Sequence, residues 1–398
     1  MTSEWKTYSV QELIDAGMLD EPLDGNHGSI HPKASDYVSA GVPFIMANNL
    51  VNGKVDYANC AYITEAQAST LRKGFAKPGD VLLTHKATIG RTAIVSDEYD
   101  TIILTPQVTY YRVKKGISNR YLKYYFDSST FQQLFANWAG SGSTRAYLGI
   151  TAQRKLPIVL PPYEVQLKIA KCCGVLDDKI YQNQRINDNL QQQAAALFSS
   201  LYDRTNTEVR FTDLIQILGG GTPKTGENTY WNGNIAFFTP KDVGTPYTLI
   251  TEKTITEEGL SHCNSRLYPV NTVFVTARGT VGKVGMSGVP MAMNQSCYAL
   301  VGKETHQLLV YFYTLKAVDR LKHKASGAVF DAITTRDFES EQIMKLSDDD
   351  AKAFLCIAEP MFQKVLNNCI ENRRLSTLRD SLLPKLMSGE IDVSAVQL

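Results

Sequence analysis

The sequence predicts an α+β fold of two mixed α/β domains separated by two long antiparallel coiled-coil helices, with an internal pseudo-twofold duplication. Two observations carry this prediction. A helical pattern over Tyr163 to Tyr202, with no Gly or Pro between Val175 and Tyr202, returns about 185 residues later in the chain. Each helical stretch also follows a region of many short strands, and the two strand regions share matched residues.

The first expected domain covers residues 1–157. It contains short segments rich in β-branched and aromatic residues, bounded by Gly, Pro or Asp, which predict strands at 44–46, 81–84, 93–95 and 107–111. One helix is expected over 120–138. Its apolar face comprises Tyr121, Tyr124, Tyr125, Leu134 and Phe135.

Residues 158–205 form the first long connecting helix. The helix is expected to begin after Pro161-Pro162, because proline is tolerated in a first turn and Glu164 suits the positive end of the helix dipole. A 40-residue helix would span roughly 60 Å. Steps of three and four residues predict a coiled-coil seam through Ile169, Cys173, Leu176, Ile180, Asn183, Asn187, Leu190, Ala194, Leu197 and Leu201.

The second expected domain, residues 206–342, repeats the plan of the first. Thr276, Thr280 and Gly282 match Thr84, Thr88 and Gly90, with a basic residue after the glycine in both places. Phe237-Phe238 matches Phe44-Ile45, and Gln295 matches Gln107. An internal duplication of one domain plus one helix accounts for these matches.

Residues 343–398 form the second long helix and a C-terminal tail. Asp348-Asp349-Asp350 stands where a helix start is expected, and acidic residues there favour the helix dipole. The second seam comprises Phe354, Ala358, Met361, Val365, Asn368, Asn372, Leu375, Arg379, Leu382 and Leu386.

Asparagine recurs at two matched places on the seams, Asn183 with Asn187 and Asn368 with Asn372. Buried asparagine can fix the register of a coiled coil at a cost in stability. The alternative is that both pairs lie at the solvated edge of the seam. We predict helix pairing through Ile180, Asn183, Asn187, Leu190, Val365, Asn368, Asn372 and Leu375.

The composition is that of an ordinary globular protein, with a formal net charge of +1. This charge argues against nonspecific coating of DNA, although local basic patches can still bind it. The seven cysteines include no Cys-x-x-Cys pair, so neither a disulfide scaffold nor a metal site is expected. No signal peptide or apolar run of 18 residues is found, and a cytoplasmic location is expected.

Two segments offer groups that contact phosphates and base edges. Thr84 to Arg91 and Thr276 to Lys283 combine hydroxyls, cations and glycines that permit close backbone approach. The alternative is an exposed basic hairpin without a ligand. The segment Gly219 to Lys224 is either a turn that brings backbone N–H groups near a phosphate or a plain turn.

No catalytic motif is found. Leu160-Pro161-Pro162-Tyr163 lacks the polar first residue of the similar amino-methyltransferase motif, and no Walker loop or paired nuclease carboxylates are present. The chain is therefore expected not to be an enzyme. Two alternatives remain: a self-sufficient DNA-modifying enzyme with an unrecognised motif, and a coiled-coil adaptor with no role on DNA.

The two halves together resemble the specificity (S) subunit of type I restriction-modification systems. The similar motifs are Gly220-Gly221-Thr222-Pro223, Tyr230-Trp231, Asp242 and Arg278 to Lys283, together with the ending Leu382 to Asp392. The first half departs from the pattern. It has Ser29 to Lys33 in place of the glycine run and His85-Lys86-Ala87 in place of Ala277-Arg278-Gly279.

The resemblance implies a non-catalytic subunit whose two target-recognition domains each read one half of a split site in double-stranded DNA, with the helices as a ruler. The implied partners are two methyltransferase (M) subunits and, in a nuclease complex, two restriction (R) subunits. S-adenosylmethionine would be used by the methyltransferase partner, and this chain would bind no cofactor. The expected DNA contacts are Lys33, Asn48, Asn49, Thr84, Lys86, Thr88, Arg91, Arg145, Thr222, Lys224, Lys241, Thr276, Arg278, Thr280 and Lys283.

Overall fold

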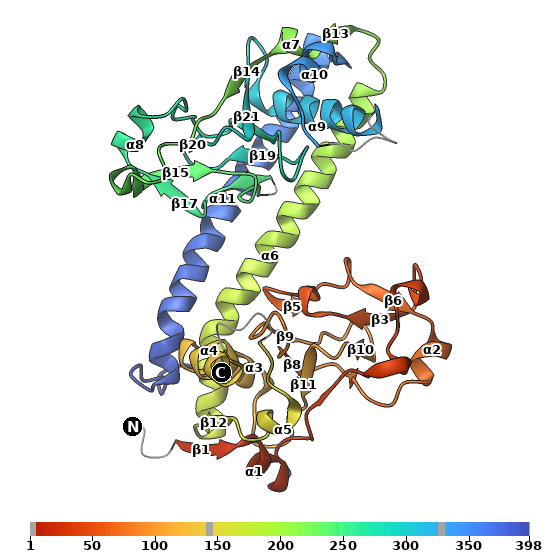
Figure 1. Ribbon diagram of the computed structural model, residues 1–398, viewed down its shortest axis with the longest axis vertical. Coiled ribbons are helices and arrows are strands. Elements are labelled where there is room, and N and C mark those ends of the chain that lie inside the picture. The colour runs from red at the N-terminus through yellow and green to blue at the C-terminus, as the bar shows by residue number, and fades with distance from the viewer. Residues whose placement is uncertain (1–4, 141–145, 245, 325–330, 398) are drawn as a thin grey trace. The chain divides into compact units, whose positions relative to one another are not determined.

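The computed structural model describes residues 5–140, 146–244, 246–324 and 331–397. The chain divides into two compact units: unit 1 comprises Met1–Lys179 and Leu375–Leu398, and unit 2 comprises Ile180–Arg374. Both contain helices and mixed sheets (Figure 1), which confirms the predicted α+β class. Each long helix is shared between the units. The predicted domain boundaries at 157/158, 205/206 and 342/343 stay a prediction.

Unit 1 contains a six-stranded sheet of order β2-β11-β8-β9-β5-β4, a four-stranded sheet of order β6-β3-β10-β7 and the pair β1-β12. Its strands are β1 (Lys6–Ser9), β2 (Leu23–Asp24), β3 (Val42–Ile45), β4 (Leu50–Val51), β5 (Gly53–Val55), β6 (Ala61–Ile63), β7 (Phe75–Ala76), β8 (Val81–Thr84), β9 (Thr92–Ile94), β10 (Ile102–Leu104), β11 (Val108–Tyr111) and β12 (Pro157–Leu160). Its shorter helices are α1 (Val10–Asp15), α2 (Glu65–Ser69), α3 (Asn119–Asp127), α4 (Ser129–Trp138) and α5 (Ile150–Gln153).

Unit 2 repeats this topology with a five-stranded sheet of order β14-β21-β18-β19-β16, a three-stranded sheet of order β17-β15-β20 and the pair β13-β22. Its strands are β13 (Glu208–Arg210), β14 (Ile215–Gly219), β15 (Trp231–Phe238), β16 (Tyr247–Thr248), β17 (Lys253–Ile255), β18 (Val273–Thr276), β19 (Val284–Ser287), β20 (Met291–Met293), β21 (Cys297–Gly302) and β22 (Gln342–Met344). Its shorter helices are α7 (Phe211–Leu214), α8 (Glu257–Ser261), α9 (Gln307–Lys324) and α10 (Thr335–Ser340).

The strand directions repeat as well. β3 and β10 are parallel, as are β15 and β20. The hairpins are β8–β9 in unit 1 and β18–β19 in unit 2. The second strand of each hairpin has a parallel neighbour: β5 lies beside β9, and β16 lies beside β19. One predicted match is wrong by one residue. The Gln107 carbonyl accepts a hydrogen bond from His85 N at 2.9 Å. In unit 2 the equivalent bond, from Ala277 N at 2.8 Å, is accepted by the carbonyl of Ser296 and not by that of Gln295. The duplication is therefore confirmed, with this shift.

The strands β8 and β18 lie between two cores in their respective units. In β8, Val81 and Leu83 pack into one cluster and Leu82 into another. In β18, Val273 and Val275 pack into one cluster and Phe274 into another. Alternate side chains of a strand point to opposite faces, so a sheet covered on both faces needs an apolar run rather than an alternating pattern.

The helix predicted over 120–138 is two helices, α3 and α4, which meet at Ser128. Ser128 has extended backbone (φ −61°, ψ 142°), and its hydroxyl accepts a hydrogen bond from Phe131 N at 3.3 Å. Serine favours this position because its side chain satisfies a free N–H at the start of a helix. The expected apolar face remains correct for Tyr121, Tyr124 and Phe135, which are buried.

The two long helices are α6 (Tyr163–Tyr202) and α11 (Asp348–Met387), each of 40 residues. The first agrees with the range predicted from the sequence. At the start of α11, the Ser347 hydroxyl accepts a hydrogen bond from Asp350 N at 3.1 Å, and three aspartates occupy the first turn. None of the helices in the described ranges combines the length and the apolar composition that a membrane span requires.

Within unit 2, the asparagines hydrogen-bond across α6 and α11. Asn183 Nδ2 donates to Asn372 Oδ1 at 2.9 Å and to Glu371 Oε2 at 2.8 Å, and Asn368 Nδ2 donates to Asn187 Oδ1 at 2.8 Å. Residue numbers rise along α6 as they fall along α11, so the segments are antiparallel, as predicted. Asn183, Asn187 and Asn368 are buried and Asn372 is half-buried, so the seam asparagines are not at a solvated edge.

The apolar members of the predicted pairing behave in two ways. Val365 is buried in the main core of unit 2, and Leu190 packs against that core. Ile180 and Leu375 are half-buried and lie on either side of the division between the units. The role of these last two residues in helix pairing stays a prediction.

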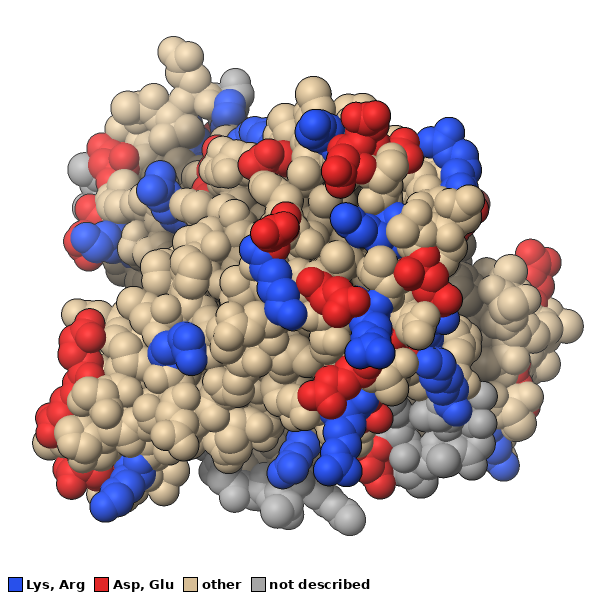
Figure 2. All heavy atoms as spheres, turned by 90° about the horizontal axis from the view of Figure 1, so that it is seen from above, with Lys and Arg blue, Asp and Glu red and all other residues tan. Residues whose placement is uncertain are grey.

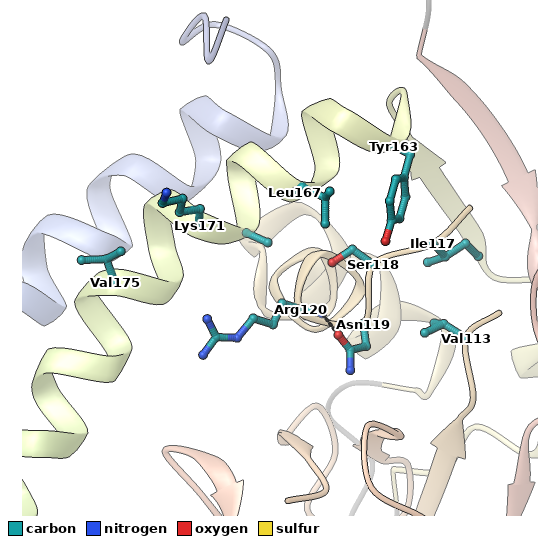
Figure 3. Close-up of a pocket in the computed structure, with 10 residues that line it drawn as sticks. Val113, Ile117, Ser118, Asn119, Arg120, Tyr163, Leu167, Lys171 and Val175 are labelled. Carbon is teal, nitrogen blue, oxygen red and sulfur yellow. Dashed lines mark hydrogen bonds between the residues drawn. The ribbon is translucent and has the colours of Figure 1, made fainter. Parts of the chain in front are cut away.

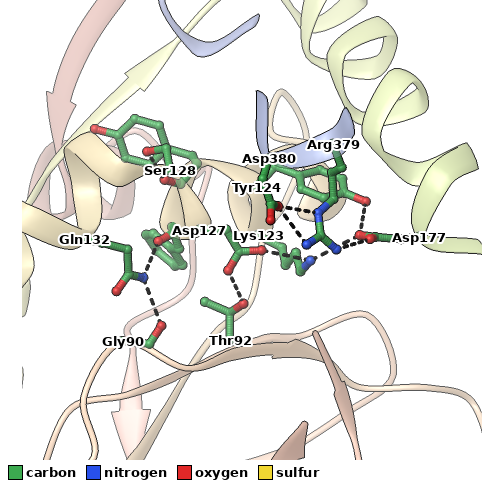
Figure 4. Close-up of polar contacts among 12 residues, drawn as sticks. Gly90, Thr92, Lys123, Tyr124, Asp127, Ser128, Gln132, Asp177, Arg379 and Asp380 are labelled. Atoms are coloured by element: carbon green, nitrogen blue, oxygen red, sulfur yellow. Dashed lines mark hydrogen bonds and ion pairs between the residues drawn. The ribbon is translucent and has the colours of Figure 1, made fainter. Parts of the chain in front are cut away.

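In unit 1, polar side chains of α3, α6 and α11 meet in a cluster that we call the ionic joint: Lys123, Tyr124, Asp177 and Arg379 (Figure 4). The Asp177 carboxylate accepts hydrogen bonds from Tyr124 Oη at 2.6 Å and Arg379 Nη1 at 2.5 Å, and Lys123 Nζ lies 3.4 Å from it. Burial alone would raise the pKa of Asp177. Lys123, Tyr124 and Arg379 outweigh this effect, so the pKa of Asp177 lies below its usual value.

In unit 2, α9 contacts α11 through rings that we call the aromatic joint: Tyr311, Phe312 and Phe362. The Phe362 ring lies 5.8 Å from that of Tyr311 and 5.5 Å from that of Phe312, measured between centroids. With the 185-residue offset between the seams, Phe362 matches Asp177 and Ala194 matches Arg379.

Candidate nucleic-acid interface

The hairpin of unit 2 joins β18 to β19 through residues 277–283. The Thr276 hydroxyl accepts a hydrogen bond from Lys283 N at 2.9 Å and donates to the Thr280 carbonyl. Gly279 and Gly282 have φ of 84° and 75°, a conformation that costs residues with a side chain more than glycine. The loop is therefore fixed from within, and Arg278, Thr280 and Lys283 are exposed on it.

A pocket of about 550 Å³ opens beside this hairpin. Four cationic side chains and one carboxylate are among its lining residues, which are Thr239, Pro240, Lys241, Glu252, Lys253, Arg278, Gly279, Thr280, Lys283, Asn294 and Ser296. Lys241 pairs with Glu252 at 3.6 Å. Neither Arg278 nor Lys283 forms an ion pair with a described residue. The pocket thus offers an excess of positive charge to an anionic ligand.

Asp242 fixes the wall of the pocket opposite the hairpin. Its carboxylate accepts hydrogen bonds from Thr239 N at 2.8 Å, from the Thr239 hydroxyl at 2.6 Å and from Glu252 N at 2.7 Å. The Thr280 hydroxyl donates to the Pro240 carbonyl at 3.3 Å. Asp242 therefore has a positioning role, since its oxygens are occupied by the loop that carries Lys241.

The glycines before Thr222 serve close packing. A Cβ on Gly220 would lie 2.3 Å from the Asn294 carbonyl oxygen, and one on Gly221 would lie 2.6 Å from Asn264 N. The Thr222 hydroxyl donates to Gln295 Oε1. Of the two alternatives for this segment, the plain turn is favoured, because its glycines are needed for contacts within unit 2. Lys224 is exposed.

The hairpin of unit 1 has the same backbone and different side chains. The Thr84 hydroxyl accepts from Arg91 N at 2.9 Å, as Thr276 does from Lys283. Ala87 and Gly90 have φ of 64° and 83°, so Ala87 adopts the conformation that Gly279 has in unit 2. Lys86, Thr88 and Arg91 are exposed on this hairpin, as their counterparts are.

Three predicted DNA contacts are wrong. Thr84, Thr276 and Asn49 are at most 2% exposed, and their polar atoms bind within the protein. Asn49 Oδ1 accepts from Met46 N at 2.9 Å and Asn49 Nδ2 donates to the Asn59 carbonyl at 3.1 Å. These residues shape the loops that carry the exposed groups. A buried side chain with satisfied polar atoms cannot also reach a base or a phosphate.

The other predicted contacts stay predictions. Arg145 lies outside the described residues. Lys33 and Asn48 are exposed in unit 1. Lys253, which lines the pocket of unit 2, and Tyr147, beside the hairpin of unit 1, were not predicted. Both reach their sites from segments distant in sequence, and nothing in their local sequence signals this.

A second pocket, of about 560 Å³, lies in unit 1 between the start of α3 and α6 (Figure 3). Three of its polar residues are engaged within unit 1. Arg120 forms two hydrogen bonds to Asp178, at 2.7 and 3.0 Å, and Lys171 Nζ donates to the Gln397 carbonyl at 2.6 Å. Ser118 accepts from Tyr121 N as the cap of α3. Both charged side chains that line this pocket, Arg120 and Lys171, are therefore engaged by other described residues of unit 1.

On one face of the molecule, side chains of both charges are mixed. On the face seen in Figure 2, lysine and arginine alternate with aspartate and glutamate. This distribution agrees with the net charge of +1. The face drawn in Figure 2 therefore has no extended basic field among its described residues.

Comparison with known proteins places these features in context. A family model described as type I restriction modification DNA specificity domain matches residues 2–192 and 204–345. The chain is 23% identical to the type I restriction enzyme MjaIX specificity subunit of Methanocaldococcus jannaschii, over 98% of this chain and 94% of that protein. It is also 23% identical to the HindI specificity subunit of Haemophilus influenzae, over 98% of this chain and 100% of that protein.

A solved structure shares the fold. The S subunit of a type I restriction-modification system from M. genitalium aligns with a TM-score of 0.57 at 14% identity, covering 96% of each chain.

Proposed function

The chain belongs to the family of type I restriction modification DNA specificity domains, and we propose that it reads a two-part DNA sequence with one recognition domain for each half-site. The observation that carries this proposal is the repeated hairpin. Both units fix the same backbone with a buried threonine, and both expose cations on it. Different side chains on a repeated backbone suit two domains that read different sequences.

In unit 2, Arg278 is the proposed base reader and Lys283 the proposed phosphate contact. Arginine reads guanine through two hydrogen bonds in the major groove, whereas lysine binds phosphate as a point charge. Lys241, Lys253 and Thr280 surround them in the pocket. In unit 1, Lys86, Thr88 and Arg91 take the corresponding places, supported by Lys33 and Asn48.

We further propose that the chain itself catalyses no reaction and acts in the cytoplasm. The curated relatives are named as subunits of type I restriction enzymes. By that analogy, two methyltransferase subunits and, in a nuclease complex, two restriction subunits would assemble on this chain. The methyltransferase would use S-adenosylmethionine, and this chain would bind no cofactor. Because this chain has a net charge of only +1, the partners would also supply many of the contacts to DNA phosphates.

The test is methylation mapping with purified components. The chain alone, a type I methyltransferase subunit alone and the two together are each incubated with genomic DNA and S-adenosylmethionine. We expect adenine methylation only from the mixture, at a motif with two specific parts and a nonspecific gap. Methylation by the chain alone would establish instead the self-sufficient enzyme. A mixture that methylates no defined motif would contradict the proposal.

A further inference from the structure

An exposed aromatic ring stands beside the hairpin of unit 1 where unit 2 has a small residue. Lys86 pairs with Tyr147 in an isolated antiparallel bridge, and Arg278 pairs with Ala332 in the same way. The next residues repeat the correspondence, because Leu148 N donates to the His85 carbonyl at 3.0 Å and Ile333 N donates to the Ala277 carbonyl at 2.9 Å. Tyr147 and Ala332 therefore occupy one position of the duplicated fold.

The Tyr147 backbone is held on both sides. Tyr147 N donates to the Ala139 carbonyl at 3.1 Å, and Ala87 N donates to the Ala146 carbonyl at 3.0 Å. The ring folds over Gly149, where an added Cβ would lie 2.9 Å from Tyr147 Oη. Although the side chain is 50% exposed, these contacts restrict where the ring can lie.

A buried histidine supports the ring from below. His85 is fully buried, its centroid lies 5.7 Å from that of Tyr147, and its Nδ1 donates to the Leu148 carbonyl at 3.1 Å. Burial lowers the pKa of His85 to about 4, so the ring is neutral at pH 7. In unit 2 the matched residue is Ala277. The histidine and the tyrosine thus form an aromatic pair that unit 2 lacks.

The surroundings of Tyr147 are cationic. Lys86 Nζ lies 5.9 Å from the ring centroid, and Thr88 and Arg91 are exposed on the same hairpin. Cations grip phosphates and fix the register of a protein on DNA, but an apolar surface among them has a different use. On the edges of base pairs in the major groove, the apolar group is the 5-methyl of thymine.

We propose that Tyr147 is a specificity-determining residue of unit 1 and that its ring contacts the 5-methyl group of a thymine in the half-site which this unit reads. This inference rests on the proposed function and adds the chemistry of one base contact to it. The two units would then contact bases through different chemistry. Unit 2 would use the cation of Arg278, beside Ala332, and unit 1 would use the aromatic ring of Tyr147, which packs on His85.

The test measures binding of the complex with its methyltransferase subunit to duplexes of the mapped site. Each thymine is replaced in turn by deoxyuridine, which removes only the methyl group. The half-site of unit 1 is identified beforehand as the one whose sequence choice Arg278→Ala leaves unchanged. We expect one thymine in that half-site whose replacement weakens binding about fourfold, the effect of one methyl group withdrawn from an apolar contact.

The variants make the assignment specific. In the Tyr147→Ala complex, the same replacement should have no effect, whereas Tyr147→Phe should retain the full loss. Tyr163→Ala, which removes a similarly exposed tyrosine from α6, should behave as the unmodified chain. If the loss persisted in Tyr147→Ala, fell in the other half-site, or occurred at no thymine, the inference would be overturned. A complex that bound no two-part site at all would instead contradict the proposed function.

Discussion

The ionic joint of unit 1 and the aromatic joint of unit 2 are matched contacts between a short helix and a long helix. Ion pairs and hydrogen bonds form the first contact, and aromatic rings form the second. In each, the helix that follows the hairpin sheet contacts a long helix: α3 contacts α6 at Asp177, and α9 contacts α11 at Phe362. The backbone is repeated and the interaction is not. A duplicated fold therefore constrains where side chains meet, while charge pairing or ring packing can each hold them together.

The difference extends to the hairpins. Ala87 adopts a positive φ that Gly279 adopts without strain, and unit 1 has a histidine and a tyrosine where unit 2 has two alanines. Unit 1 thus carries charge at its helix joint and aromatic rings at its hairpin. Unit 2 has the reverse arrangement. Variants of matched residues can show whether these differences have the energetic consequences that their chemistry implies.

The largest effect is expected from the aromatic joint. Phe362→Ala removes a buried ring that contacts Tyr311 and Phe312, and should destabilise unit 2 by about 3–5 kcal/mol. Hydrogen exchange of amides in α9 and α11 measures this loss. The control is Ile357→Ala, which truncates an exposed apolar residue on α11. Equal effects of the two variants would mean that the aromatic joint contributes no special packing.

The ionic joint should respond less, and with a dependence on pH. Asp177→Asn removes the carboxylate that Lys123 and Arg379 share, while Asp127 and Asp380 still pair with them, and should destabilise unit 1 by about 2 kcal/mol at pH 7, less than for a fully buried pair. The pKa of Asp177 is lowered in the folded state. Its contribution is therefore complete above the unfolded pKa of about 3.9 and is lost as the pH falls through the lower folded value.

Unfolding of the full chain and of Asp177→Asn, followed at α3 between pH 7 and pH 2, checks both statements. The free-energy difference should shrink below about pH 4. Asp178→Asn is the matched control, because its carboxylate pairs with Arg120 on the surface and should contribute less than about 1 kcal/mol. A difference for Asp177→Asn that grew at low pH would show that the aspartate destabilises the joint.

The smallest expected effects come from exchanging the hairpin residues at positive φ. Gly279→Ala should destabilise unit 2 by about 0.5–1 kcal/mol, because the strain exceeds the entropy gained in the unfolded chain. The added Cβ itself has space, since its nearest neighbour would be Pro240 Cβ at 4.0 Å. Ala87→Gly should stabilise unit 1 by a similar amount. Denaturant titration of the two variants checks the opposite signs, and equal signs would contradict the matched backbone.

Most of the helical architecture could be predicted from the sequence because it depends on periodicity. The bounds of α6 and the buried asparagine pairs follow from a seam held over many turns. The break at Ser128 was missed, since serine also occurs inside helices and the apolar face continues across it. The one-residue shift between Gln107 and Ser296 was missed because hydrogen-bond register, not residue type, defines that match.

The site was less predictable for a different reason. The sequence indicates which residues have hydroxyls and cations, but burial of Thr84, Thr276 and Asn49 is decided by sheets that form between distant segments. The same is true of Lys253 and Tyr147, which reach the hairpins through tertiary contacts. Local spacing therefore predicted the hairpins and most of their exposed cations, but it did not predict the neighbouring residues Lys253 and Tyr147.

The central claim is that each unit reads its own half of the target, and methylation mapping of two matched variants tests it most directly. Arg278→Ala and Lys86→Ala change the same position of the duplicated hairpin, and each is mapped genome-wide with the methyltransferase partner. We expect Arg278→Ala to lose about 1–3 kcal/mol of base discrimination at one half-site only. Lys86→Ala should relax the other half-site and leave the first unchanged. Relaxation of the same half-site by both variants, or of both half-sites by either, would contradict the account.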